Sequence, residues 1–594
     1  EELIYMLQFN KQQQQAINFY KGSCSVIAGA GSGKSSVLVY RIKNLIEKYH
    51  VNESDILAIS FTRNTANDLK KKLSKMGYTN VNVGTFHSIC GNILFNNNID
   101  VSNLIKDWQI ENCFKNIDKK ANIKEIQSFI GYQKSYFKTY KDSFMPKDSN
   151  YTETELRKFY KEYEIFKQKN RLYDFDDWLI ECYKLLQKTK ITYDFILVDE
   201  YQDTNLIQSL ILKQLCESGN IFVVGDYRQA IYSFRGGIPE LFMNFHKEWK
   251  NTTVINMNIN YRSCDNIVKN SNKFIKNYYG DYKYYSDSIA NNKNNGNIFI
   301  NSYLSKEDEA VEVVDKIEEL LKNKVKPCEI AVLYRLNSHS GNIENELKKR
   351  RIGYDIDNDS SFFKRKEIST IISYLRLIDN QDDDGALENI YNNRNYPLTY
   401  FSKSVFNNIK SYASKNDLSI YEALLSFEYD KVWQKQNINT FKDNISRLKL
   451  QYDKELNIDR LIDNIVNVFK IKDLIQEKYN DSEDYEDRIS SIETLKTFIK
   501  GNDISKFISY IDSNSNTNNK KKDENIKLMT VHKSKGLEFK NVFIISIEDD
   551  KFPHIKSPIE DEARLFYVGI TRAKENLYIT QIGNDNKFIN QYNS

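Results

Sequence analysis

Short apolar runs, each followed by a polar or glycine-rich turn and then by a helix-prone stretch, recur along the first part of the chain. The runs lie at 26–28, 56–61, 81–83, 195–198 and 221–224. Strands that alternate with helices in this way predict a parallel sheet, whose ligand sites lie at the carboxyl ends of the strands. Between about 92 and 170 the pattern changes to long helical periodicity with many Lys and Tyr, which predicts a helical insertion.

The turn after the first run is rich in glycine. It reads Ala28-Gly29-Ala30-Gly31-Ser32-Gly33-Lys34-Ser35-Ser36 and leads into a helix-prone segment. Glycines let backbone N–H groups converge on an anion at the start of a helix, whose dipole favours negative charge. In such a P-loop, Lys34 would reach the β and γ phosphates of a nucleotide, and the Ser35 hydroxyl would ligate Mg²⁺. A glycine turn with a purely structural role is the alternative.

An acidic pair supplies the second half of a nucleotide site. The run at 195–198 ends in Asp199-Glu200, where Asp199 would hold Mg²⁺ through water and Glu200 would take the proton of the attacking water. Gln13, in a polar stretch before the P-loop, has an amide that donates and accepts together, as the N6 and N7 edge of adenine requires. A run of Gln is also typical of a solvated helix face, and the local pattern leaves both interpretations open.

Polar and aromatic turns after other strands are candidates for a nucleic-acid surface. Thr62 and the run Thr85-Phe86-His87 follow two predicted strands, although His87 could equally be a capped turn residue. Farther along, Gln229 would face the γ-phosphate and lies five residues before Phe234, which precedes Arg235. An aromatic ring beside a cation can stack on a base and hold a phosphate, whereas a core position for Phe234 is the structural alternative.

Composition sets limits on these interpretations. Among 594 residues, 85 Lys and Arg barely exceed 81 Asp and Glu, so a nucleic-acid contact requires a local basic groove. The seven cysteines form no Cys-x-x-Cys pair and predict reduced thiols in a cytoplasmic protein. No apolar run approaches the roughly 18 residues that span a bilayer, so no membrane association is expected. The chain starts at Glu1 without a Met, which leaves open whether the native terminus precedes it.

In the order of these motifs, the chain resembles the superfamily 1 DNA helicases of the UvrD, PcrA and Rep group, from about Asn10 to about Thr580. The matching positions are Gln13, Lys34-Ser35, Phe61-Thr62-Arg63, Thr85-Phe86-His87, Asp199-Glu200-Tyr201-Gln202-Asp203, Gln229 with Phe234, Asn260-Tyr261-Arg262-Ser263, Ala331-Val332-Leu333-Tyr334-Arg335, Thr530-Val531-His532-Lys533-Ser534-Lys535-Gly536-Leu537-Glu538 and Gly569-Ile570-Thr571-Arg572. The resemblance implies an α/β fold with two RecA-like parallel-sheet motor domains, 1A and 2A, each with a mainly helical insertion, 1B or 2B. The implied ranges are 1–91 and 171–254 for 1A, 92–170 for 1B, 255–378 and 521–594 for 2A, and 379–520 for 2B.

The same resemblance implies roles for individual residues. Around ATP, Tyr261 would stack on adenine, Glu538 would contact the sugar, Arg262 would touch the γ-phosphate, and Arg572 would be the arginine finger, in addition to the catalytic residues Lys34, Asp199, Glu200 and Gln229. DNA would be contacted by Phe61, Thr62, Arg63, Thr85, Phe86, His87, Phe234, Arg235, Tyr334, Arg335, Thr530, His532 and Lys535. Because an arginine near the γ-phosphate accelerates hydrolysis by roughly 10³ to 10⁵, placing two on a second domain makes hydrolysis depend on cleft closure.

The implied activity is ATP-dependent movement from 3′ to 5′ on single-stranded DNA, with unwinding at single/double-strand junctions, in DNA repair or replication. One alternative is a translocase or switch that strips or loads proteins, such as the helicase-like subunit of an anti-phage defence complex, which would have a protein partner and unwind weakly. RNA is a third substrate class. In the second insertion, where relatives carry a Gly-x-Gly turn that holds duplex phosphates, this chain has Asn392-Asn393-Arg394-Asn395-Tyr396-Pro397, which argues against strong unwinding.

Overall fold

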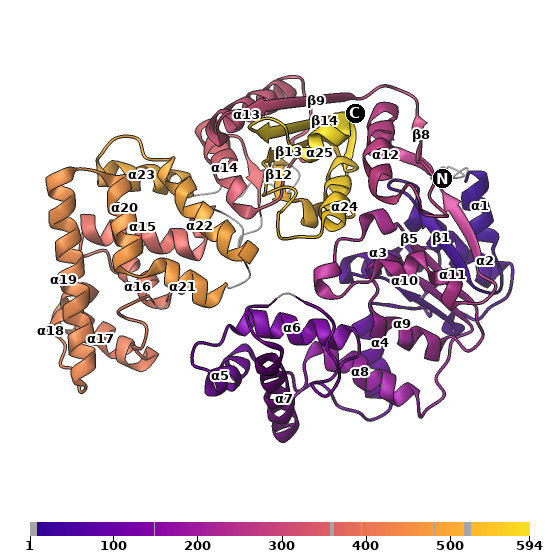
Figure 1. Ribbon diagram of the computed structural model, residues 1–594, viewed down its shortest axis with the longest axis horizontal. Helices are drawn as coiled ribbons and strands as arrows, with labels where there is room; N and C mark the ends of the chain where they lie inside the picture. The colour runs from indigo at the N-terminus through magenta and orange to yellow at the C-terminus, as the bar shows by residue number, and fades with distance from the viewer. Residues whose placement is uncertain are drawn as a thin grey trace.

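The computed structural model describes residues 9–593 except 148, 357–361, 394, 480–481 and 516–523. Its main parts are two six-stranded sheets and two helical regions (Figure 1). Every pairing between neighbouring strands of the two large sheets is parallel. The predicted α/β fold with two parallel sheets is therefore confirmed.

The first sheet is built from the alternating segments that the sequence predicts. Its strand order is β3-β2-β4-β5-β1-β6. These strands are β1 (Cys24–Ala28), β2 (Ile56–Ile59), β3 (Asn82–Gly84), β4 (Phe195–Val198), β5 (Ile221–Gly225) and β6 (Thr253–Met257). The helices of this part are α1 (Lys11–Asn18), α2 (Lys34–Glu47), α3 (Arg63–Lys75), α4 (Phe86–Asn96), α8 (Phe175–Leu186), α9 (Leu206–Leu215), α10 (Pro239–Met243) and α11 (Phe245–Glu248). Because β6 pairs with β1 as far as Met257, the first sheet continues past the expected boundary at 254.

The second sheet has the strand order β11-β12-β10-β13-β14-β9. Its strands are β9 (Asn297–Tyr303), β10 (Ile330–Tyr334), β11 (Tyr354–Asp355), β12 (Ile526–Thr530), β13 (Phe539–Ile547) and β14 (Ala573–Ile582). The helices of this part are α12 (Asp265–Tyr279), α13 (Lys306–Lys322), α14 (Ser340–Lys349), α24 (Ile559–Ile570) and α25 (Lys587–Asn593). Between the two sheets in the chain, β7 (Ile259–Cys264) pairs with β8 (Ile289–Asn292). The chain thus passes from the first sheet to the second through this short pair.

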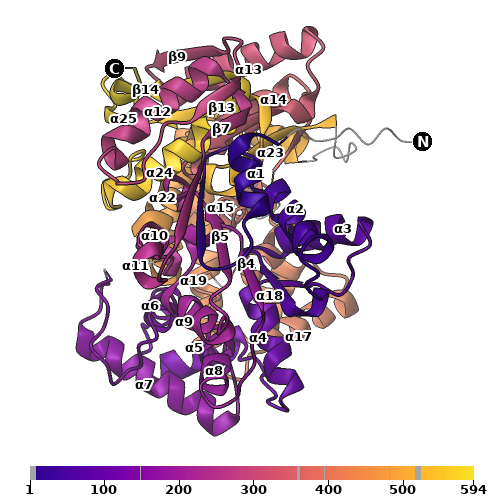
Figure 2. The same cartoon turned by 90° about the vertical axis from the view of Figure 1, so that its right-hand side faces the viewer.

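The first helical region consists of α5 (Asp107–Ile117), α6 (Ile123–Ser135) and α7 (Glu153–Asn170). Figure 2 shows it at one end of the molecule and the second sheet at the other. Within its Lys- and Tyr-rich sequence, the side chain of Lys134 is only 2% exposed. The Lys134 ammonium lies 2.7 Å from Asp174, 2.6 Å from Asp177 and 3.0 Å from Glu164. This buried network ties α6 to the start of α8.

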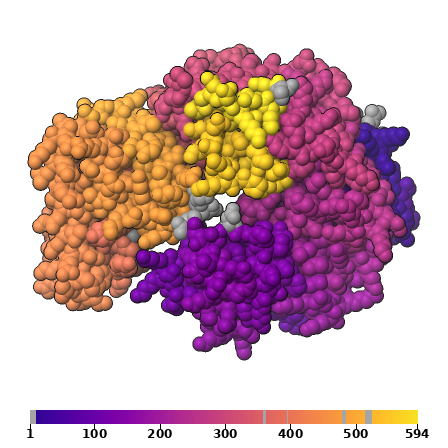
Figure 3. All heavy atoms as spheres, viewed as in Figure 1, coloured from indigo at the N-terminus to yellow at the C-terminus, as the bar shows by residue number. Residues whose placement is uncertain are grey.

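The second helical region contains α15 (Lys366–Asp379), α16 (Asp384–Asn392), α17 (Lys403–Asn416), α18 (Ile420–Ser426), α19 (Val432–Glu455), α20 (Ile458–Val468), α21 (Ile471–Lys478), α22 (Ser482–Lys496) and α23 (Ile504–Ser515). One apolar core joins them, and it includes Phe362 and Ile371, which precede the expected boundary at 379. In the space-filling view a hollow opens between this region and the first helical region (Figure 3). At one point Lys124 of α6 approaches Asp484 of α22 at 3.9 Å.

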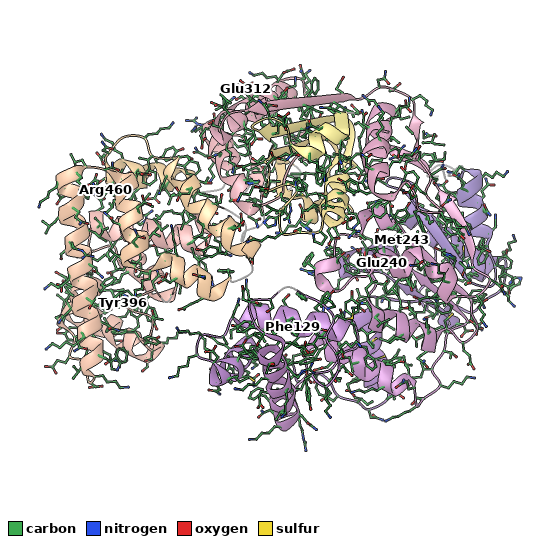
Figure 4. The ribbon with its side chains drawn as sticks, in the orientation of Figure 1. Phe129, Glu240, Met243, Glu312, Tyr396 and Arg460 are labelled. Atoms are coloured by element: carbon green, nitrogen blue, oxygen red, sulfur yellow. The ribbon has the colours of Figure 1, made fainter. Side chains whose placement is uncertain are left out.

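The segment 392–397, which stands where relatives carry a Gly-x-Gly turn for duplex phosphates, begins at the last residue of α16. Tyr396 is labelled in the second helical region in Figure 4, and Asn395 beside it is fully buried. Arg394 lies outside the described residues. Among the residues that are described, no helix is long and apolar enough to cross a lipid bilayer.

Candidate functional site

The P-loop joins β1 to α2 at the carboxyl edge of the first sheet. Gly31 and Gly33 have φ values of 68° and 83°, in the left-handed region that favours glycine. A Cβ on Gly31 would stand 2.7 Å from the Cβ of Arg262, so the loop and the β7 segment pack closely. The Ser32 hydroxyl is buried and has no hydrogen-bond partner among the described residues. With the first N–H groups of α2 at its end, this loop fits a phosphate group.

The acidic pair at the end of β4 faces Lys34. The Lys34 ammonium lies 3.6 Å from the Glu200 carboxylate. Burial, together with the charge of Glu200, raises the pKa of Asp199 above its usual range. Burial alone would raise the pKa of Glu200 as well, but the Lys34 and Lys535 ammonium groups outweigh it and lower this pKa. Burial disfavours the ionised form of the Asp199 carboxyl, and a nearby cation would stabilise that form. Asp199 therefore fits the predicted role of holding Mg²⁺.

An amide connects the two sheets. Gln229, at the end of the short 3-10 turn Tyr227–Gln229 that follows β5, donates from Nε2 to Asp226 at 2.7 Å and accepts at Oε1 from Arg572 at 2.9 Å. Arg572 follows α24 and is almost fully buried, and it also donates to the carbonyl groups of Val568 and Leu537 at 2.8 and 3.1 Å. The arginine from the second sheet therefore reaches the sheet that carries the acidic pair.

Tyr261 and Arg262 lie on β7, against the P-loop. The backbone N–H of Tyr261 donates to the Gly31 carbonyl at 2.9 Å, and its hydroxyl accepts from Asn10 at 2.8 Å. The guanidinium of Arg262 donates to Glu538 at 2.8 Å and to the Thr571 carbonyl at 3.0 Å. The structure brings together these parts of the predicted nucleotide site.

Gln13 lies on the other side of the loop, on α1. Its Nε2 donates to the Ser32 carbonyl at 3.0 Å, and its Oε1 accepts from the Asn10 backbone at 3.0 Å. The solvated helix face is therefore not the environment of Gln13, which is buried against the P-loop. In this conformation the Gln13 amide is hydrogen-bonded to the backbone of Ser32 and Asn10. To bind adenine, the amide would have to replace these hydrogen bonds with bonds to the base.

Several of the predicted DNA contacts form one aromatic surface. Phe234 is 54% exposed, which excludes the core position considered for it. Its ring lies 6.0 Å from His532 in an edge-to-face arrangement, and the Arg235 guanidinium is 5.3 Å from its centre. Phe61, after β2, stacks at 5.0 Å on Tyr232. The motif comparison did not single out Tyr232, although its position between Gln229 and Phe234 is a local signal for it.

Other predicted DNA contacts are buried. Phe86 belongs to the apolar core, and Tyr334 on β10 is fully buried. Arg335 is buried and donates to Glu562 at 2.8 Å, because an arginine inside the protein needs a carboxylate partner. Thr85 caps α4. A direct contact of these four side chains with a strand is not available in this conformation.

The remaining predicted DNA contacts differ in exposure. Thr62 is exposed and caps α3, whose first residue is the exposed Arg63. His87 and Thr530 are partly buried. Burial and then the charge of Arg63 lower the pKa of His87, so its ring is neutral at physiological pH. Of these four residues, Thr62 and Arg63 have exposed side chains.

Lys535 is the clearest departure from its predicted role as a contact to a DNA phosphate. Its ammonium donates to the Asp203 carboxylate and, at 2.8 Å, to the Gln229 carbonyl, and it lies 4.0 Å from Glu200. Burial raises the pKa of Asp203 to about 6 even with this lysine beside it. Lys535 thus faces the acidic groups of the first sheet.

Comparison with known proteins covers both halves of the chain. Residues 9–250 match the family described as "UvrD/REP helicase N-terminal domain", and residues 255–584 match the family described as "UvrD-like helicase C-terminal domain". The ATP-dependent DNA helicase Rep of Buchnera aphidicola subsp. Schizaphis graminum is 31% identical over 97% of this chain and 93% of its own length. The ATP-dependent DNA helicase PcrA of Bacillus subtilis is 32% identical over 96% of this chain and 82% of its own length. PcrA of Staphylococcus aureus is 29% identical over 96% and 83%.

Proposed function

The chain belongs to the UvrD-like helicase family, and from this membership we propose that it is an ATP-dependent DNA helicase that moves from 3′ to 5′ on single-stranded DNA. The relatives named Rep and PcrA are ATP-dependent DNA helicases. The observation that carries the proposal is the hydrogen bond from Arg572 of the second sheet to Gln229 of the first. A nucleotide between the two sheets would thus be touched by groups from both, as conversion of hydrolysis into movement requires.

The proposed ATP site divides its tasks between the two sheets. The P-loop with Lys34 holds the phosphates, while Ser35 and Asp199 hold Mg²⁺. When bound, Mg²⁺ neutralises charge on the phosphate oxygens. Glu200 accepts the proton of the attacking water, supported by its position beside Lys34. The second sheet supplies cations for charge that develops in the transition state. In addition to Gln229, the proposed nucleotide contacts are Gln13, Tyr261, Arg262, Glu538 and Arg572.

The proposed strand-binding surface is the aromatic one. An aromatic ring stacks on any base, which suits a protein that moves along a strand without choosing its sequence. The proposed strand contacts are Phe61, Thr62, Arg63, Phe234, Arg235 and His532, of which Phe61 and His532 are partly buried and the other four are exposed. The group Thr85, Phe86, Tyr334 and Arg335 is proposed to support this surface from below, with His87 and Thr530 at its edges.

The proposed domains follow the four-part division of the family, with two changes. We propose that 1A continues to Met257, because β6 belongs to the first sheet. We also propose that 2B begins near Phe362, because α15 contributes to the core of the second helical region. The parts are then 1A (9–91 and 171–257), 1B (92–170), 2A (258–361 and 524–593) and 2B (362–515).

Two assays test the function. ATP hydrolysis is expected to require Mg²⁺ and to rise with single-stranded DNA, and Lys34→Ala or Glu200→Gln is expected to abolish it. Lys43→Ala is the matched control, since Lys43 lies on the same helix α2 and is partly exposed. Undiminished hydrolysis in either site variant would refute the active-site assignment.

A second assay separates unwinding from movement. With 3′-tailed duplexes the protein is expected to displace the paired strand, and with 5′-tailed duplexes it is expected not to. Displacement of a protein from single strands without separation of duplex would favour the translocase that strips or loads proteins. Stronger stimulation by RNA than by DNA would contradict the proposed substrate.

A further inference from the structure

Arg564 on α24 reaches across from the second sheet to the segment that carries Phe234. Its side chain is buried, and Nε donates to the Ala230 carbonyl at 2.6 Å. Nη2 donates to the Ser233 hydroxyl at 3.2 Å. No motif prediction from the sequence included this residue.

The remaining contacts of Arg564 hold its guanidinium within its own part of the molecule. Nη1 donates to the Tyr279 hydroxyl at the end of α12 at 2.5 Å, and Nη2 also contacts Asp561, one turn earlier on α24. The planar guanidinium donates in several fixed directions, so it can bridge these groups and the segment together. From the part that contains the first sheet, Glu240 of α10, labelled in Figure 4, adds a further negative charge near Arg564.

The segment from Gln229 to Phe234 is therefore held at two points by one helix and the turn after it. Arg572 contacts the Gln229 side chain, and Arg564 contacts Ala230 and Ser233. Because α24 is a continuous helix, a shift of α24 relative to the first sheet moves both contacts together. The first contact lies beside the acidic pair, and the second lies next to the exposed ring of Phe234.

We propose that Arg564 is a positioning residue that links movement of the second sheet to the grip of Phe234 on the strand. Arg572 signals the state of the nucleotide at one end of the segment. Arg564 sets the position of the other end of the segment, which carries Phe234. This inference rests on the proposed function, since it assumes that the protein hydrolyses ATP and moves along DNA.

The test uses Arg564→Lys in the full chain. Lysine keeps the positive charge but loses the planar fork that bridges the acceptors. ATP hydrolysis without DNA is expected to stay within about twofold of wild type, because Arg564 touches none of the acidic pair. ATP consumed per nucleotide travelled is expected to rise about threefold to tenfold, the range for losing one typical intramolecular hydrogen bond. The melting temperature of each variant is measured in parallel.

Ser233→Ala and the double variant make the test specific. Ser233→Ala removes one acceptor and is expected to change the ATP cost in the same direction but less. In the double variant the two effects are expected not to add, because both act through one contact. Arg350→Lys is the matched control, since Arg350 pairs with Asp315 and Glu346 within the second sheet's own part.

Two results would overturn the inference. One is a wild-type ATP cost per nucleotide in Arg564→Lys. The other is a lower melting temperature with every activity falling in parallel, together with a normal ATP cost in Ser233→Ala, which would show a purely structural role. Failure of the proposed function is distinguishable, because the wild-type protein itself would then not hydrolyse ATP or not move.

Discussion

Replacing Lys535 by Met removes an ammonium while keeping most of the side-chain stem. The ammonium joins Asp203 and the Gln229 carbonyl, which belong to the first sheet, to a residue of the second. Its loss is therefore expected to weaken the closed arrangement of the two sheets more than the fold of either. We expect the effect to appear in hydrolysis and not in strand affinity.

The magnitude follows from burial. Removing one partner of a buried ion pair costs about 3 to 5 kcal/mol, since the other charge is left without compensation. Asp203 can reduce this cost by taking up a proton, because burial holds its pKa near 6 already and removing the ammonium raises it further. The lower end of the range then applies. About 3 kcal/mol corresponds to roughly a hundredfold lower population of the closed cleft.

The assay compares two measurements on Lys535→Met. The turnover number for ATP without DNA is expected to fall about a hundredfold, in proportion to the closed population. Affinity for single-stranded DNA, measured at two salt concentrations, is expected to stay close to wild type. Lys533→Met is the control, because Lys533 is an exposed neighbour in the same turn.

The opposite pattern would refute this reasoning. A lysine that holds a DNA phosphate contributes to affinity and to its salt dependence, and its removal reduces the slope of log affinity against log salt by about 0.7 to 1. If Lys535→Met lost DNA affinity and salt slope while hydrolysis without DNA was normal, the phosphate contact predicted from the sequence would be correct. The pair with Asp203 would then have no part in turnover.

Three further predictions rest on single side chains. Arg572→Ala is expected to leave nucleotide affinity within a few-fold of wild type and to lower hydrolysis at least about a hundredfold, and equal losses in both would contradict a transition-state role. Phe234→Ala is expected to keep the melting temperature, because its ring is largely exposed, and to slow movement along DNA more than hydrolysis; a lower melting temperature would argue for a packing role. Lys134→Met is expected to lower the free energy of unfolding, measured with urea, by about 3 to 5 kcal/mol, and an unchanged value would show that Lys167, which contacts the same carboxylates, is sufficient for them.

The parts of the site that the sequence predicted are those with a local pattern. A glycine turn between a strand and a helix predicts a P-loop, and β1 and α2 flank it as expected. The acidic pair likewise follows β4 directly. The strand order could not be predicted from local patterns, because β1 lies between β5 and β6, which are far from it in the chain.

The environment of charged side chains could not be predicted in the same way. Lys535 and Asp203 are 332 positions apart, and Lys134 is 40 positions from Asp174. A lysine in a polar stretch of sequence predicts a solvated or phosphate-binding side chain, because the sequence does not show which carboxylate lies beside it in the folded protein. The same holds for Tyr334, which the family resemblance implies is a DNA contact, although the packing around β10 buries it completely.

The distribution of charge between the two sheets supports the proposal that one nucleotide site serves both for closure and for hydrolysis. The first sheet contributes the carboxylates of Glu200 and Asp203, and the second contributes Lys535 and Arg572. Buried charges of opposite sign attract strongly where water is excluded. In this structure the cations from the second sheet are paired with carboxylate and amide groups of the first.

A polyphosphate in the P-loop would offer the same cations a more negative partner, so its binding would exchange these pairs and shift the second sheet. Loss of the γ-phosphate would return the cations to their protein partners, and each exchange would move the segment that ends at Phe234.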